Sequence, residues 1–229
     1  TTAAPTVSTT TTTIPPGPRT RCEQVVHVGD STSVGLVAPN VLAPEQRVDA
    51  RYREVGVRLP FTDISGARSI IERYQNKPNA AEAVSKAMKD GFDGCWVFAM
   101  GTNDTANQAV GSKYDSADRV GRLMSQVGTD TPVMWLTVKS LRTTGPYAET
   151  EMQKWNLALL AACQKYPNMR VYDWASQVHD DWFQPDGIHF TKVGYAYRAT
   201  LTARALAAAF PLSGPDVTGC TFVPPPDDQ

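Results

Sequence analysis

The chain has 229 residues, with 22 basic and 23 acidic side chains, a formal net charge of −1 and 41% apolar residues. This length and apolar fraction suit one soluble domain with its own hydrophobic core. No basic cluster indicates binding to nucleic acid or to an anionic membrane surface, and no apolar run is long enough to span a membrane.

The two ends of the chain differ in composition from its middle. Residues 1–21 are rich in Thr and Pro and include a run of five Thr followed by Ile-Pro-Pro-Gly-Pro. Such a composition cannot build a core, and its prolines are incompatible with a helix, so we expect an extended linker. Because no signal peptide precedes it, we expect either that a signal was removed or that an anchor lies upstream in a longer protein. Residues 22–220 are the predicted domain, and residues 221–229 are a predicted disordered tail.

Between the tails, strand-like and helix-like segments alternate. The predicted strands are 24–28, 48–55, 95–100, 133–138 and 170–173. The predicted helices are 68–74, 80–89, 116–128, 149–166 and 192–210. The run at 95–100 is apolar throughout and the run at 133–138 is apolar except for Thr137, which is typical of strands covered on both faces. The alternation predicts an α/β fold, a three-layer α/β/α sandwich around a parallel sheet of about five strands.

The four cysteines bear on metal binding and on cellular compartment. None forms a CxxC pair, and with three histidines in the chain a zinc site is poorly supported. Cys22 and Cys220 bracket the predicted domain, so a disulfide between them would join the two ends of the fold. Cys95 and Cys163 either form a second bridge or remain buried thiols. An even count is compatible with an oxidising compartment.

The first predicted strand ends abruptly at Gly29, which is followed by Asp30 and Ser31. Glycine allows a sharp turn here. Ser31 then lies outside the carboxyl end of the strand, where open α/β sheets bind their ligands. A hydroxyl held there beside helix N-terminal amides suits a nucleophile. The alternative is that Ser31 is an ordinary helix N-cap.

Two further polar motifs follow predicted strands. Gly66 lies in the loop after the second strand, where its backbone N–H could approach a reacting carbonyl; the alternative is a glycine in a turn that starts a helix. Asn103, in the sequence Gly-Thr-Asn-Asp at 101–104, follows the strand at 95–100. Its amide could donate to an oxyanion, and the alternative is an Asx-turn.

Asp186 and His189 lie three residues apart, just before the last predicted helix. In a turn, the carboxylate could reach Nδ1 of the imidazole and leave Nε2 facing a hydroxyl, which is the arrangement of a general base and its orienting acid. The alternative is an Asp-Gly turn followed by a surface histidine. His27 lies within a strand and is better interpreted as a core residue, and His179, before two aspartates, as part of a solvated loop.

In combination and in this order, these motifs resemble the four sequence blocks of the SGNH hydrolases, also called GDSL esterases. The matching residues are Gly-Asp-Ser at 29–31, Gly66, Gly-Thr-Asn-Asp at 101–104 and Asp-Gly-Ile-His at 186–189. The resemblance spans about residues 25–200. The chain departs from many members at Thr32, where they have Leu, which leaves assignment to the lipolytic branch less secure.

The resemblance implies a flavodoxin-like sheet and a serine esterase. Ser31 would be the nucleophile, His189 the general base and Asp186 its orienting partner. The oxyanion hole would consist of the backbone N–H groups of Ser31 and Gly66 and the side chain of Asn103. Without a phosphate loop, a dinucleotide fingerprint or a metal cluster in the sequence, no cofactor and no metal are implied.

The layout is also similar to the extracytoplasmic SGNH domain that follows a membrane acyltransferase-3 domain in bacterial O-acyltransferases. No long apolar lid is present, which favours a small acyl group on a polar molecule. Trp174, Trp182 and Phe183 could stack on a sugar ring, or they could pack in the core.

We therefore expect an O-acyl esterase or O-acyltransferase that transfers a small acyl group such as acetyl. Its substrate would be an acylated carbohydrate or a small ester, with a cell-envelope glycan as the expected polymer, and it would act outside the cytoplasm. We further expect a monomer, without a nucleic-acid partner, whose full-length form carries a membrane acyltransferase domain upstream. The alternatives are a free secreted carboxylesterase of broad specificity and a non-catalytic module that binds acylated glycan.

Overall fold

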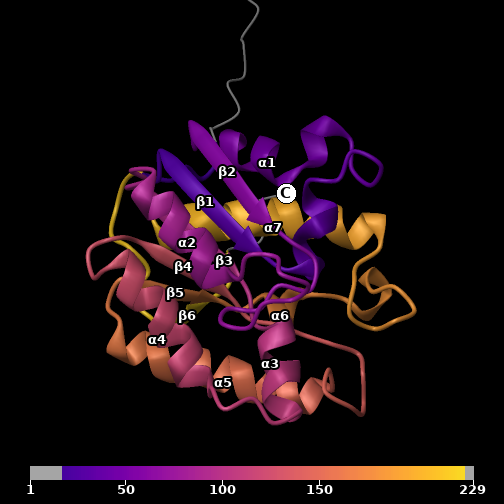
Figure 1. The fold of residues 1–229 in the computed structure, drawn as a ribbon. Helices are drawn as coiled ribbons and strands as arrows, with labels where there is room; N and C mark the ends of the chain where they lie inside the picture. Colours follow the sequence, from indigo (N-terminus) through magenta and orange to yellow (C-terminus); the bar gives the residue numbers. More distant parts are fainter. Residues whose placement is uncertain (1–16, 225–229) are drawn as a thin grey trace, which may run out of the picture.

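The computed structural model describes residues 17–224 (Figure 1). At its centre lies a six-stranded parallel sheet with the strand order β2-β1-β3-β4-β5-β6. The strands are β1 Gln24–Gly29, β2 Leu59–Ile64, β3 Cys95–Ala99, β4 Val133–Leu136, β5 Met169–Tyr172 and β6 Thr221–Phe222. The helices are η1 Ser31–Leu36, η2 Pro44–Gln46, α1 Val48–Glu54, α2 Ala80–Lys89, α3 Thr102–Ala109, α4 Ser116–Val127, α5 Glu149–Lys165, α6 Trp174–Gln177, η3 Asp180–Trp182 and α7 Lys192–Ala209.

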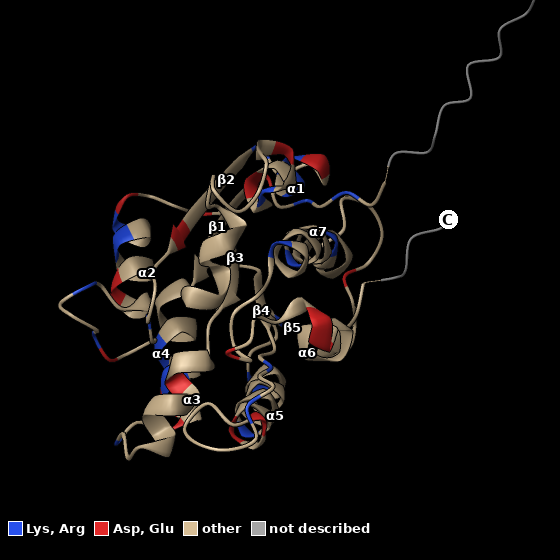
Figure 2. Ribbon diagram, turned by 90° about the vertical axis from the view of Figure 1, so that its right-hand side faces the viewer, with Lys and Arg blue, Asp and Glu red and all other residues tan. Residues whose placement is uncertain are grey.

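Helices cover both faces of the sheet, which makes the three-layer α/β/α sandwich that the sequence predicts. Figure 2 shows α7 and α6 on one side of the strands and α2 and α4 on the other. Successive residues of a strand point to opposite faces. Val25 and Val97 accordingly pack in the core under α1 and α7, while Val26 and Trp96 pack in the core under α2, α4 and α5. Two-sided burial is why the central strands are apolar throughout.

The segment 48–55, predicted as a strand, is mostly the helix α1. Val48, Tyr52 and Val55 are its buried residues, and their spacing of four and three is helical. The second strand of the sheet is instead β2, which the sequence analysis missed. β2 lies at the sheet edge with several exposed side chains and contains Pro60, so it lacks the pattern of a buried strand.

The predicted helix at 68–74 is also wrong, because this segment belongs to an irregular loop between β2 and α2. Ala67 at its start has a left-handed backbone with φ 57°. Conversely, α3 forms directly after β3, in a segment for which the sequence predicted no helix. The helices predicted at 80–89, 116–128, 149–166 and 192–210 are present with bounds within one residue.

Both ends of the described chain are tied to the domain. The N–H of Thr20 donates to the Val55 carbonyl at 2.8 Å, and its hydroxyl donates to the Phe210 carbonyl at 2.7 Å. At the other end, β6 adds a sixth strand by pairing with β5, so the predicted disordered tail does not begin at residue 221. Residues 1–16 of the predicted linker and 225–229 of the predicted tail lie outside the described residues.

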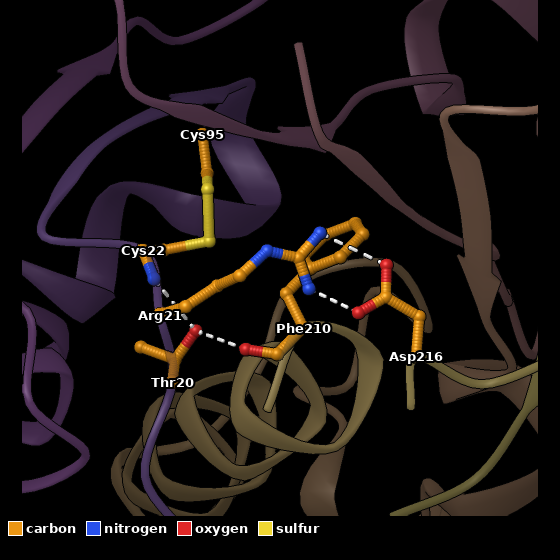
Figure 3. The surroundings of a disulfide bond; sticks show 6 residues. All are labelled: Thr20, Arg21, Cys22, Cys95, Phe210 and Asp216. Carbon is orange, nitrogen blue, oxygen red and sulfur yellow. Dashed lines mark hydrogen bonds and ion pairs between the residues drawn. A yellow bond between two sulfur atoms is a disulfide. The ribbon is translucent and has the colours of Figure 1, made fainter. Parts of the chain in front are cut away.

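Two disulfides join different cysteines from those the sequence suggested. Cys22 pairs with Cys95 (Figure 3), and Cys163 pairs with Cys220, each with Cα atoms 5.7 Å apart. The expected Cys22–Cys220 bridge is therefore wrong, and no thiol is left free. The pairing follows from the strand order: Cys22 precedes β1, and Cys95 is the first residue of the neighbouring strand β3.

Two disulfides are typical of proteins that fold in an oxidising, extracytoplasmic compartment. Within residues 17–224, no helix has the length and apolarity needed to cross a membrane.

Replacing Cys22 and Cys95 with Ser should lower the free energy of unfolding by about 2–4 kcal/mol, because the bridge closes a long loop in the unfolded chain. The two cysteines are 73 positions apart. Urea unfolding of the variant and of the wild type measures the difference in the free energy of unfolding. The double variant Cys163→Ser, Cys220→Ser, which lacks the other disulfide, is measured for comparison. Non-reducing peptide mapping should recover a Cys22–Cys95 fragment, and a Cys22–Cys220 fragment would contradict the pairing.

Candidate active site

Ser31 lies at the carboxyl end of β1, where the chain turns directly into η1. The turn needs glycine, since a Cβ on Gly29 would lie 2.6 Å from the Cβ of Ser33. Asp30 caps η1, because its Oδ1 accepts from the backbone N–H of Thr32 at 2.8 Å and from the Thr32 hydroxyl at 2.7 Å. Thr32, where many SGNH hydrolases have Leu, thus holds the buried side chain of Asp30 in place. The neighbouring Ser31 stays partly exposed.

The structure brings Ser31, His189 and Asp186 into one chain of hydrogen bonds. His189 Nε2 lies 3.0 Å from Ser31 Oγ, and His189 Nδ1 lies 2.6 Å from Asp186 Oδ2. The other oxygen of Asp186 accepts from the backbone N–H groups of Ile188 and His189, both at 2.9 Å. Burial alone would raise the pKa of Asp186, but the hydrogen bonds from His189 and the two amides lower it. The carboxylate is therefore ionised and holds the imidazole with Nε2 toward the serine.

Asn103 lies in the first turn of α3, just beyond β3. The preceding Gly101 has φ 140°, and a Cβ there would lie 2.2 Å from Trp155 Nε1, so only glycine fits. The Asn103 amide is oriented from both sides: Nδ2 donates to the Arg68 carbonyl at 3.0 Å, and Oδ1 accepts from the Tyr147 hydroxyl at 3.2 Å. An amide nitrogen carries two hydrogens, and the bond to Arg68 uses one of them.

Gly66 lies two residues beyond the end of β2, whose last residue, Ile64, is in register with Gly29 of β1. The next residue, Ser65, donates its N–H to the Gly29 carbonyl at 3.1 Å. Gly66 and Ser31 therefore belong to the same edge of the sheet. A Cβ on Gly66 would meet no atom within 4 Å, so the space above its backbone is open.

Loop 65–79, which carries Gly66, is held by a buried polar network. Asp104 Oδ1 accepts from the backbone N–H of Ile70 at 2.9 Å and from Arg119 Nη1 at 2.8 Å. Arg119 is fully buried, and its two terminal nitrogens also donate to the two carboxylate oxygens of Glu72. The guanidinium thereby links loop 65–79 to α3 and α4, the helices on which Asp104 and Arg119 lie. Burial raises the pKa of Asp104 to about 7, and Arg119 opposes this shift.

A second buried polar group lies under Ser31. His27 on β1 is fully buried, and its Nδ1 lies 2.8 Å from the Tyr52 hydroxyl. Burial and the charge of Arg198 lower the pKa of His27 to about 3, so its ring stays neutral. It is the core residue that its place in a strand predicts. Arg198 is itself buried, with its guanidinium over the rings of Trp174 and Phe190 at 4.9 and 5.2 Å.

One residue of this region has no signal in the sequence, and the structure decides between the alternatives that the sequence left open for others. Tyr147, which orients Asn103, lies in a loop that no motif marks. Trp174, Trp182 and Phe183 are buried, so they are core residues rather than a platform for a sugar. His179 is exposed, as a loop residue should be, although its ring packs on Trp182.

No protein-family model matches the sequence, and no curated protein matches it. Solved structures do match its fold. Est24, a carbohydrate acetylesterase from Sinorhizobium meliloti, is 19% identical with a TM-score of 0.62, over 82% of this chain and 100% of that chain. A member of the lipolytic G-D-S-L family from Veillonella parvula is 15% identical with a TM-score of 0.57, over 80% of this chain and 96% of that one.

A third match is the C-terminal catalytic domain of the peptidoglycan O-acetyltransferase OatA from Streptococcus pneumoniae. It is 14% identical with a TM-score of 0.55, over 81% of this chain and 94% of that chain. The structural neighbours are thus SGNH/GDSL lipolytic esterases and an O-acetyltransferase domain. The resemblance found in the sequence is confirmed at the level of the fold.

Acid should weaken the network that holds loop 65–79. Burial alone would raise the pKa of the Glu72 carboxyl, but hydrogen bonds from Arg119 and Ser112 lower it from 4.5 to about 2. A lowered pKa in the folded state stabilises the protein above pH 4.5, and this contribution is lost as the pH falls from 4.5 toward 2. Allowing for solvent screening of a partly exposed carboxylate, it should be on the order of 1–2 kcal/mol.

In the Glu72→Gln variant, the free energy of unfolding should be lower at neutral pH and should fall less steeply between pH 4.5 and 2. Chemical unfolding at a series of pH values measures this slope. Glu45→Gln, at an exposed position, is the control and should keep the wild-type slope. Equal slopes in the Glu72 variant and the wild type would exclude the stabilising role of this carboxylate.

Proposed function

We propose that the chain is a serine-dependent O-acyl esterase or O-acyltransferase that acts on a cell-envelope glycan. The observation that carries this proposal is the hydrogen-bonded chain from Ser31 Oγ through His189 to Asp186 at the carboxyl edge of a parallel sheet. A serine hydroxyl is a weak nucleophile until a neighbouring base removes its proton. The contacts of His189 with Ser31 Oγ at 3.0 Å and with the ionised Asp186 at 2.6 Å support the role of His189 as this base.

The reaction begins when the Ser31 oxygen attacks the carbonyl carbon of the ester and His189 Nε2 takes the hydroxyl proton. The imidazolium that forms is stabilised by Asp186. When the tetrahedral intermediate collapses, the ester C–O bond breaks and His189 returns the proton to the leaving alcohol. Water then attacks the acyl-enzyme with His189 again as the base, which gives the carboxylic acid and free Ser31. If a sugar hydroxyl attacks instead, the acyl group is transferred to it.

The negative charge of the tetrahedral intermediate needs hydrogen-bond donors. We assign this role to the backbone N–H groups of Ser31 and Gly66 and to the Asn103 side chain. The position of Gly66 at the same edge of the sheet as Ser31 supports the assignment. So does the fixed amide of Asn103, because donors that are already oriented need no reorganisation when the charge develops.

The activities of two fold neighbours, a carbohydrate acetylesterase and a peptidoglycan O-acetyltransferase domain, support the glycan substrate and the small acyl group. The two disulfides support a site of action outside the cytoplasm. A monomer without a cofactor, and a membrane acyltransferase domain upstream in the full-length protein, complete the proposal. A secreted carboxylesterase of broad specificity is a second candidate, favoured by the aryl esterase of M. smegmatis among the fold neighbours.

Ser31→Ala should lower the hydrolysis of p-nitrophenyl acetate by at least about 10³-fold, because the nucleophile is lost. A fluorophosphonate probe should label the wild type at Ser31 and leave the variant unlabelled. Ser125→Ala, at an exposed position of α4, is the matched control and should behave as the wild type. If neither the wild type nor Ser31→Ala turns over ester while both bind acylated glycan, the chain is a binding module instead.

Asn103→Ala should lower kcat by about 10²–10³-fold with little change in KM, because a donor to the developing charge is removed. Tyr147→Phe should lower kcat less, by about 3–10-fold, because the amide keeps its donor and loses only one orienting bond of ordinary strength. Tyr114→Phe, away from Asn103, provides the matched control. A larger loss in Tyr147→Phe than in Asn103→Ala would contradict these roles.

A further inference from the structure

An open groove of about 1000 Å³ runs along the outer face of α7. η2 and α1 form one wall with Gln46 and Arg51, and α6 and η3 form the other with Gln177 and Trp182. The floor consists of α7 residues that recur on one face between positions 192 and 204. At a rise of 1.5 Å per residue, this floor is about 18 Å long. We call it the α7 groove.

An aromatic platform lies in the α7 groove. The ring of Tyr197 is 52% exposed and lies parallel to Trp182, with the ring centroids 4.5 Å apart and an interplanar angle of 5°. Trp182 is nearly buried and also contacts the ring of His179, at 4.7 Å. Tyr197 is therefore held in place by stacking, and ordering it on binding costs little entropy. A flat, exposed and fixed ring suits the C–H face of a pyranose sugar.

Polar groups flank this platform. The hydroxyl of Tyr172 donates to Gln177 Oε1 at 2.7 Å, which fixes the side-chain amide and leaves its nitrogen as a donor toward a ligand. On the opposite wall, Gln46 adds a second amide. A cleft that combines an aromatic surface with a few placed hydrogen-bonding groups is typical of ligand sites.

The charge of the α7 groove is one-sided. Arg51, Lys192 and Arg204 line it, and none of the lining residues is acidic. Arg51 shows how a carboxylate can bind there, because its Nη1 donates to both oxygens of the exposed Glu54 at 2.8 and 3.0 Å. A carboxylate on a ligand would compete with Glu54 for this contact. The groove thus suits an acidic ligand better than a neutral one.

The α7 groove is connected through the chain to the segment that carries His189. Lys192, at one end of its floor, is the third residue after His189. The N–H of Thr191 donates to the Trp182 carbonyl at 2.8 Å, so the segment that carries His189 is bonded to the wall of the groove. The Lys192 end of the groove is therefore tied to the segment that carries the proposed catalytic base.

We propose that the α7 groove binds a carboxylate-bearing glycan strand, with a sugar ring on Tyr197 and its carboxylates at Arg51 and Lys192. Glycan binding is inferred from the residues of the groove alone. The further role, in which the groove holds a polymeric substrate for Ser31, rests on the proposed function. An apolar peptide is the other class of occupant that an exposed tyrosine could take, and the test separates the two.

The binding test uses the Ser31→Ala chain, which cannot turn over an ester. It is titrated calorimetrically with oligomers of alternating N-acetylglucosamine and N-acetylmuramic acid, with chitin oligomers of the same length, and with an apolar peptide. The acidic oligomers should bind most tightly. Adding Tyr197→Ala should weaken their binding by at least about tenfold, and Tyr197→Phe should retain it, because the ring supplies the contact.

Lys192→Ala should weaken the acidic oligomers more than the chitin oligomers, and added salt should do the same. Leu157→Ala, at an exposed site on α5, is the matched control and should bind as the parent chain does. Circular dichroism establishes that each variant is folded. Equal binding with and without the Tyr197 ring would overturn the proposal, as would tighter binding of the apolar peptide.

The two proposals fail in distinguishable ways. If the wild type hydrolyses p-nitrophenyl acetate at Ser31 but glycan binding does not depend on Tyr197, the groove proposal is wrong and the proposed function stands. If the wild type hydrolyses no ester but the Ser31→Ala chain binds acidic oligomers through Tyr197, the proposed catalytic function is wrong and the groove stands.

Discussion

The register of the parallel sheet is the constraint on which the candidate site depends. Gly29 of β1 is paired with Ile64 of β2 on one side and with Ala99 of β3 on the other. The three strands therefore end at the same edge of the sheet. The residues that follow them, which are distant in sequence, lie side by side at that edge. Burial on both faces fixes this register, since a shift by one residue would turn every core side chain to the wrong face. Ser31, loop 65–79 and Asn103 are neighbours for this reason.

The fold class and the site motifs could be predicted from the sequence because both have local signatures. β3 and β4 are uninterrupted apolar runs, and the motifs at Ser31 and Asn103 directly follow strand ends. The placement of Asp186 against His189 was also local, since a three-residue turn brings them together. What joins His189 to Ser31 is tertiary structure, and only the resemblance to a known family suggested it.

Other features have no local signature. The alternation of Ala50, Tyr52 and Glu54 predicts a strand, whereas the buried residues of α1, Val48 and Tyr52, are four positions apart, as in a helix. β2, an edge strand with exposed side chains, has no buried pattern to detect. The disulfide pairing depends on strand order, which sequence spacing does not give. The link from Arg119 to loop 65–79 is likewise long-range, because burying a guanidinium requires carboxylates from two other segments.

The second disulfide, Cys163–Cys220, also holds the edge strand β6 against the sheet. β6 has two residues and would be marginal by itself, yet Cys220 beside it is bonded to Cys163 on α5. This covalent clamp keeps β6 over the otherwise open hydrogen-bonding edge of β5, while Pro60 interrupts the donors of β2 at the opposite edge. Unpaired strand edges are templates for aggregation. The oxidised clamp thus protects the folded chain from edge-to-edge association with its own copies, which a reducing environment would permit.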